Sequence, residues 1–165
     1  MILGLDASTS TVGWAFSNEN VIVDAGFFDI KKFDTNKTKS KEFLSFIQAH
    51  QHYKLIENIN LEAALNGFCA GRTSQQVIIK LSRFNAIFEY IIGESTGLTV
   101  SLINVNTARK KLFGKSREKG MKSKDFVQTR LEMLFDIHKF DVLNKKNNWD
   151  ERNADMYDAM VMALT

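Results

Sequence analysis

The chain has 165 residues, of which 44% are hydrophobic and 25% charged, a balance typical of a folded domain and unlike that of a disordered chain. Its one cysteine, Cys69, excludes an internal disulfide, and no apolar run approaches the ~18–20 residues that cross a bilayer. The net charge of +3 hides two basic stretches, at 109–124 and 31–41, which favour a polyanionic partner.

The start of the chain predicts three strands. A short apolar run at 2–5 ends at Asp6, and apolar stretches of strand character follow at 11–17 and 21–29. The sequence Asn-Glu-Asn at 18–20 is typical of a tight turn between two strands. We therefore expect the three strands to pair in antiparallel fashion.

The middle of the chain predicts a helix, a strand and a longer helix. Apolar residues have helical spacing over 38–52, and a fourth strand at 55–62 ends in a glutamate. After a loop at 63–72, capping residues introduce a helix over 75–92. This helix is apolar on more than one face, which suggests a dimer interface; the alternative is that the extra face packs under the helix at 38–52.

The last part of the chain predicts a fifth strand and two further helices. The strand covers 98–104, and the basic stretch at 109–124 is expected to be a loop and the start of an amphipathic helix over 123–137. A final helix at 153–164 is apolar at nearly all positions. Three hairpin strands followed by alternating helices and strands predict an α/β fold, with a five-stranded mixed sheet flanked by helices.

Four acidic residues lie where burial should exclude them. Asp6 closes the first strand and Glu62 closes the fourth, while Asp155 and Asp158 are three residues apart and so share one face of the apolar last helix. Unpaired buried carboxylates are costly or take up a proton. A hard divalent cation such as Mg²⁺ binds through carboxylates and would resolve the conflict. The pattern indicates a metal centre, although a single member could also cap a turn or a helix end.

Together these pieces resemble the RuvC-type Holliday-junction resolvases of the ribonuclease H-like superfamily. The matching segments are MILGLDASTSTVGWAF at the first two strands, INLEAAL at the fourth strand and ADMYDAMVMAL at the last helix, with basic residues before the last helices. The resemblance spans essentially the whole chain and implies a ribonuclease H-like fold. It also implies a catalytic tetrad that binds two Mg²⁺ or Mn²⁺ ions, formed by Asp6, Glu62, Asp155 and Asp158.

The resemblance further implies a homodimeric endodeoxyribonuclease that resolves four-way DNA junctions by paired symmetric nicks, through two-metal hydrolysis. An apolar wedge at the junction centre is expected from Leu65 and Phe68, with core packing as the alternative. Basic residues would position the DNA through its phosphates, unless they only form solvated loops. These residues are Lys110, Lys111, Lys115, Arg117, Lys119, Lys122, Lys124 and Arg72.

Other functions remain open on the sequence alone. The same site could cut forks, flaps or RNA–DNA hybrids, and a DNA-binding module without catalysis would need only the basic residues. The segment GLDASTSTVG also resembles the first phosphate loop of sugar kinases and actin-like ATPases. Those enzymes need two such domains and a second glycine-rich loop, which argues against a phosphotransferase.

The expected setting is a reducing cytoplasm, of a bacterium or of a phage-infected cell. The first residues, MILGLDAST, carry an aspartate where a secretion signal needs a basic and then an apolar segment. We expect one nuclease domain covering residues 1–165, with no membrane partner.

Overall fold

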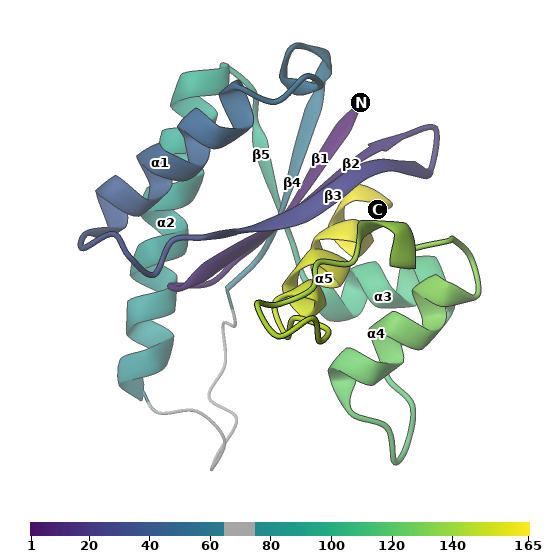
Figure 1. Cartoon of the computed structure of the whole chain (residues 1–165). Helices are drawn as coiled ribbons and strands as arrows, with labels where there is room; N and C mark the ends of the chain where they lie inside the picture. Colours follow the sequence, from purple (N-terminus) through teal and green to yellow (C-terminus); the bar gives the residue numbers. More distant parts are fainter. Residues whose placement is uncertain (65–74) are drawn as a thin grey trace.

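A computed structural model describes residues 1–64 and 75–165 and contains one five-stranded sheet (Figure 1). The strand order is β3-β2-β1-β4-β5; β1 pairs antiparallel with β2, and β2 with β3, whereas β1–β4 and β4–β5 are parallel. The strands are β1 (Ile2–Ala7), β2 (Thr11–Asn18), β3 (Val21–Asp29), β4 (Asn58–Glu62) and β5 (Val100–Ile103). The mixed sheet predicted from the sequence is confirmed.

The turn between β2 and β3 forms where the sequence predicts it. Glu19 and Asn20 both have positive φ angles, 50° and 63°. Two consecutive residues in this conformation make a tight turn whose twist suits an antiparallel pair of strands.

Helices cover both faces of the sheet. Figure 1 shows α1 and α2 on one face and α5, with α3 and α4 beside it, on the other. A separate cluster of buried apolar side chains lies on each face, and both clusters include residues of the sheet. The helices are α1 (Asn36–Gln48), α2 (Gln75–Thr96), α3 (Val105–Phe113), α4 (Ser123–Glu132) and α5 (Asn153–Ala163).

The last helix, α5, lies directly on β1 and β2. A Cβ atom at Gly4 or at Gly13 would overlap backbone atoms of α5, so only glycine permits this approach. From the sheet, the Ser17 hydroxyl donates to the Ala163 carbonyl (2.5 Å) and the Asn60 amide donates to the Met162 carbonyl (3.0 Å). These contacts fix where α5 presents its acidic residues.

Several element boundaries differ from the sequence prediction. The helix expected at 38–52 begins earlier, because Thr35 accepts a hydrogen bond from the Thr38 N–H and caps a helix that starts at Asn36. It ends at Gln48, and residues Tyr53–Leu55 form a separate 3-10 helix, so β4 is shorter than 55–62.

The other shifts are small and concern element ends. The strand expected at 98–104 is limited to β5, and the helix expected at 123–137 ends with α4. The helix α2 continues to Thr96, four residues beyond the predicted end at Ile92.

The helix α3 was not predicted. The basic stretch at 109–124, expected to be a loop before the next helix, begins inside this helix. The Asn104 side chain accepts hydrogen bonds from the N–H groups of Asn106 and Thr107, and Gly114 ends the helix with a left-handed φ of 76°. An asparagine cap and a terminal glycine are ordinary helix signals, and the run of charges obscured them.

The apolar surface of α2 has a buried face and an exposed face, and the expected packing against α1 is found. One face packs against α1 and the sheet, with the rings of Phe88 and Phe43 5.2 Å apart. A second face leaves Ile79, Ile87 and Tyr90 exposed, at 49%, 38% and 67%.

Candidate metal centre

Two of the four predicted acidic residues come together at the carboxyl ends of adjacent parallel strands. The register pairs Leu5 of β1 with Leu61 of β4, so the residues that follow, Asp6 and Glu62, lie side by side. Strand alternation places them on the face that carries Gly4 and Asn60, which both contact α5. Both carboxylates therefore face α5.

The helix α5 adds a third carboxylate to this pair. Asp6, Glu62 and Asp158 each offer a carboxylate oxygen, and the three oxygens lie within 4.8 Å of one another. Asp158 is buried, at 8% exposure, whereas Asp6 and Glu62 are partly open to solvent. The group, as found among the described residues, does not include Asp155, which lies one turn earlier on α5.

Burial and like charge make this group unfavourable when all three carboxylates are ionised. Desolvation raises the pKa of Glu62 to about 7, and Asp158 adds to the effect. The pKa of Asp6 is raised well above its usual value by desolvation and then by Glu62 and Asp158. Desolvation likewise raises the pKa of Asp158, against the opposing effect of Arg109.

A hard divalent cation fits this group. The donors are all carboxylate oxygens, which Mg²⁺ and Mn²⁺ favour, and the partial exposure of Asp6 and Glu62 leaves room for further oxygen ligands. A bound cation would also offset the repulsion that raises the three pKa values. Asp6, Glu62 and Asp158 are the residues that would hold it.

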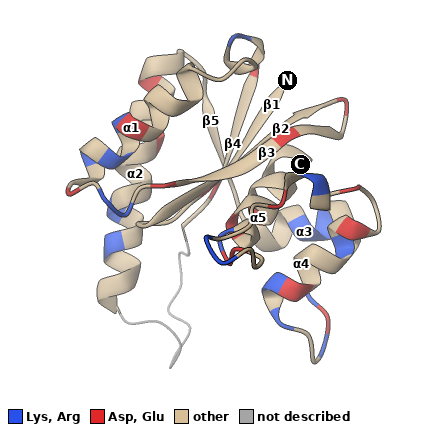
Figure 2. Cartoon of the chain, viewed as in Figure 1, with Lys and Arg blue, Asp and Glu red and all other residues tan. Residues whose placement is uncertain are grey.

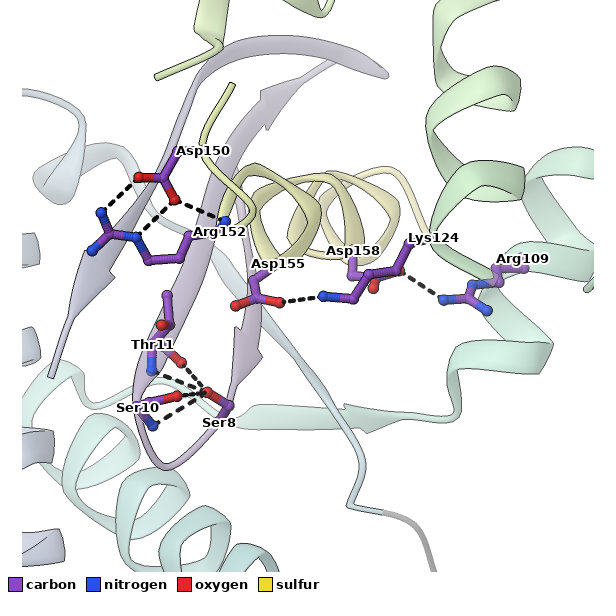
Figure 3. A network of polar contacts seen from close by, with 9 residues as sticks. All are labelled: Ser8, Ser10, Thr11, Arg109, Lys124, Asp150, Arg152, Asp155 and Asp158. Atoms are coloured by element: carbon purple, nitrogen blue, oxygen red, sulfur yellow. Dashed lines mark hydrogen bonds and ion pairs between the residues drawn. The ribbon is translucent and has the colours of Figure 1, made fainter. Parts of the chain in front are cut away.

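Arg109 is part of the site and was not predicted as a site residue. Its Nη2 donates to Asp158 Oδ1 at 2.8 Å and its Nη1 donates to Ser123 Oγ at 2.7 Å (Figure 3 shows the ion pair). Arg109 is 7% exposed, so this is a buried ion pair. The sequence holds a signal for it: with α3 recognised, Arg109 falls on the helix's apolar face with Ala108 and Leu112.

Lys124, at the start of α4, contacts the fourth predicted carboxylate. Its Nζ lies 3.2 Å from Asp155 Oδ1, and 60% of its side chain is exposed. In Figure 3 Lys124 and Arg109 approach α5 from the same side. Thus α3 and α4 each place one cation against an acidic residue of α5.

The remaining predicted DNA contacts are spread over α3 and the loop that leads to α4. Lys111 contacts the Thr165 carbonyl, beyond the far end of α5 from Asp155, and Lys115 pairs with Glu118 at 2.7 Å. Arg72, Leu65 and Phe68 lie outside the described residues. Besides Lys111, the exposed basic side chains of this segment are Lys110, Arg117, Lys119 and Lys122.

Comparison with known proteins identifies solved structures that have a similar fold. No protein-family model and no curated protein sequence matches the chain. The structure is similar to that of Thermus thermophilus RuvC, with a TM-score of 0.62 and 12% identity over 99% of this chain and 90% of that chain. It is similar to T. thermophilus RuvC in complex with a Holliday junction substrate (TM-score 0.65, 11% identity, the same coverage). The yeast mitochondrial Holliday junction resolvase Ydc2 gives 0.56 and 14%, over 99% of this chain and 75% of that one.

These likenesses confirm the predicted ribonuclease H-like fold. The three carboxylates add a possible metal centre at the place where β1, β4 and α5 meet. No helix within the described part of the chain is both long enough and apolar enough to span a membrane.

Proposed function

We propose that this protein is a metal-dependent endodeoxyribonuclease that resolves four-way DNA junctions by paired symmetric nicks. The observation that carries the proposal is the group formed by Asp6, Glu62 and Asp158, with Asp155 one helical turn away. The likeness in fold to RuvC and Ydc2, over nearly the whole chain, supports the choice of substrate.

Two divalent cations, Mg²⁺ or Mn²⁺, would supply the chemistry at this site by activating water for attack on a phosphodiester and by stabilising the leaving oxygen. The three carboxylates lie within 4.8 Å of one another, and the resemblance to the RuvC-type resolvases implies that Asp6 would serve both ions. Glu62 would serve one ion, and Asp158 with Asp155 the other. Arg109 orients Asp158 through its buried ion pair.

Lys124 has two positions in this proposal. With Asp155 free of metal, its ammonium neutralises that carboxylate. If Asp155 helped to hold a cation, Lys124 would be free to bind the phosphate next to the cleaved bond. The exposed side chains Lys110, Arg117, Lys119 and Lys122 hold neighbouring phosphates, which position DNA without reading its sequence.

The second apolar face of α2 supports a homodimer. Beside Tyr90, a groove of about 590 Å³ runs between α2 and the start of β5; its lining includes Gly93 and Leu98 and the acidic side chains of Glu89 and Glu94. A second copy packed on this face would bury Ile87 and Tyr90 in both subunits. A twofold dimer would present two metal centres to a junction whose strands are themselves related by twofold symmetry.

A panel of labelled DNA substrates tests the choice of substrate. Four-way junction, linear duplex, fork, flap and RNA–DNA hybrid are incubated with the protein in Mg²⁺ or Mn²⁺. We expect paired nicks at symmetric positions in the junction and little cutting of the others. Preferred cutting of a fork, flap or hybrid would keep the nuclease and overturn the junction as substrate. Binding without metal-dependent cutting of any substrate would leave a DNA-binding module.

A further inference from the structure

A small hairpin precedes α5 and is ordered by its own hydrogen bonds. Leu143 and Trp149 form an antiparallel bridge, and the Asn144 N–H donates to the Asn148 carbonyl at 2.8 Å. Asn147, with a φ of 60°, closes the turn through its own N–H to the Asn144 carbonyl at 2.9 Å. The segment is therefore a defined structure and not an extended linker.

The hairpin is attached to the first residue of α5. The Asn153 side chain, fully buried, accepts from the Val142 N–H (3.0 Å) and donates to the Val142 carbonyl (2.9 Å). Asp155 follows two residues later on the same helix. The hairpin thus has a fixed position relative to the proposed metal centre.

The exposed side chains of the hairpin are apolar at its base and basic at its tip. Trp149 is 40% exposed and Leu143 53% exposed, and the indole rests near Tyr157 with ring centroids 6.4 Å apart. The tip, residues 144–148, holds Lys145, Lys146 and three asparagines, all exposed, and no acidic residue. An exposed aromatic ring beside two lysines suits a nucleic-acid strand better than a protein partner.

Further basic residues lie beside the base of the hairpin. Arg152 pairs with Asp150 at 2.7 Å and with Asp29, at the end of β3, at 2.9 Å. Asp29 lines a surface hollow of about 460 Å³ together with Lys31 and Lys32, which begin the second basic stretch. Figure 2 shows Lys and Arg on the loop before α5, and Figure 3 shows Arg152 on the opposite side of α5 from Lys124.

We propose that the hairpin at 142–150 is a DNA-binding element of the nuclease. Trp149 stacks on an unpaired base of the branched DNA, and Lys145 and Lys146 bind the flanking phosphates, so that the DNA is held on both sides of the metal centre. This proposal deepens the proposed nuclease function and rests on it for the identity of the polyanion. Aromatic stacking tolerates any base, which suits a protein that recognises a branch and not a sequence.

Intrinsic fluorescence reports on this contact directly. The chain has two tryptophans, and Trp14 is only 7% exposed, so a quencher in solvent reaches mainly Trp149. The experiment adds a four-way junction to the Asp6→Asn protein, which leaves the DNA uncut. We expect the junction to quench the emission of Trp149 and to protect it from acrylamide, and Trp149→Phe to abolish the change.

Binding of the labelled junction over a range of salt concentrations separates stacking from charge. Trp149→Ala should weaken binding by about tenfold, the loss of one base–aromatic stack, with the salt dependence unchanged. The double variant Lys145→Ala/Lys146→Ala, at the exposed tip, should reduce the slope of log K against log salt by about 1.5. Lys54→Ala, at the amino end of β4 and so at the other end of the sheet, is the control and should change neither quantity.

The outcomes distinguish the hairpin from the nuclease. Quenching of Trp149 by DNA, together with a wild-type protein that cuts no substrate, would support the hairpin contact and overturn the nuclease. Junction cutting by the wild type, with no quenching and with wild-type binding by both hairpin variants, would overturn the hairpin contact alone. In the second case the exposed Trp149 and Leu143 would be a surface for another protein.

Discussion

Glu62 and Asp6 are the residues at which folding opposes ionisation, because burial disfavours their charged forms. The pKa of Glu62 is about 7 in the folded chain, against 4.5 for an ordinary glutamate. Between these values the folded protein binds more protons than the unfolded chain, so its stability falls as pH rises. The raised pKa of Asp6 acts in the same direction.

We therefore expect the metal-free protein to lose stability from about pH 4.5 to about pH 7, by roughly 3 kcal/mol from Glu62. Urea unfolding in a chelator at several pH values measures this loss. Glu62→Gln should flatten the curve, and Glu42→Gln, on the exposed side of α1, should not. A wild-type stability that rises over this range would contradict the assignment.

Added Mg²⁺ should reverse the loss, because the cation binds the deprotonated carboxylates. The stabilisation by saturating Mg²⁺ is expected to be larger at about pH 8 than at about pH 5. Thermal unfolding with and without the cation measures it. Equal stabilisation at both pH values would show that the cation binds elsewhere.

Arg109 is expected to matter for folding as well as for the site. Replacing it with Met leaves Asp158 buried without its partner, which costs about 3–5 kcal/mol of unfolding free energy. The double variant Arg109→Met/Asp158→Asn should recover much of that loss, because the remaining partner is no longer charged. Urea unfolding of the four proteins in a chelator gives the coupling, and additive effects would contradict the ion pair.

At the residue scale, Asp6 and Glu62 were predictable because each is a carboxylate at the end of a short apolar strand. The partner of Asp158 was missed, because Arg109 belongs to α3, whose cap at Asn104 and stop at Gly114 were obscured by the surrounding charges. The i, i+3 spacing of Asp155 and Asp158 placed them on one side of α5, but not in one cluster. Lys124 contacts Asp155 from another helix, so the spacing of residues within α5 could not predict this ion pair.

Among the elements, α3 and α4 determine how much positive charge the metal site contains. The Lys124 ammonium lies next to Asp155 where a metal ion would bind that carboxylate. The ion pair is exposed enough for a metal ion to displace the lysine. In the proposed metal centre, a metal ion and Lys124 would therefore compete for the Asp155 carboxylate.

Lys124→Met should tighten Mn²⁺ binding by about two- to fivefold, the equivalent of an exposed ion pair. Calorimetric titration of the DNA-free protein measures the change. Lys119→Met removes the same charge from the exposed loop before α4 and should leave the affinity nearly unchanged. Unchanged or weaker binding by Lys124→Met would show that the lysine does not compete.

The predicted elements were most reliable where apolar periodicity was strong and least reliable where charge was dense. The three opening strands and α5 match closely, since their apolar residues alternate or recur over the whole element. The segment around α3 failed because its lysines concealed a cap at Asn104 and a stop at Gly114. The ion pair between Arg109 of α3 and Asp158 of α5 joins residues that are far apart in the sequence, so no local sequence pattern predicts it.

For the whole molecule, the order of strands and helices was enough to predict the sheet and its two covered faces. The homodimer is a proposal that rests on the exposed apolar face of α2. Ile87 and Tyr90 lie on this face, and a charge there would have to be buried in the proposed dimer.

Tyr90→Glu should convert a dimer into a monomer, because the carboxylate would be desolvated without a partner. Light scattering at micromolar concentration measures the mass. Leu55→Glu places the same charge on an apolar side chain that is 55% exposed elsewhere and should remain dimeric. A wild-type monomer would exclude the dimer and, with it, symmetric nicking by paired sites.

Metal-dependent cutting of a labelled four-way junction is the most direct test of the proposed centre. Wild type, Asp6→Asn and Asp136→Asn, the last an exposed aspartate outside the site, are compared at increasing Mg²⁺ or Mn²⁺. We expect paired nicks from the wild type and the control, and a loss of at least about 100-fold in Asp6→Asn with junction binding retained. An uncut junction at every metal concentration, or cutting by Asp6→Asn at the wild-type rate, would contradict the proposed nuclease.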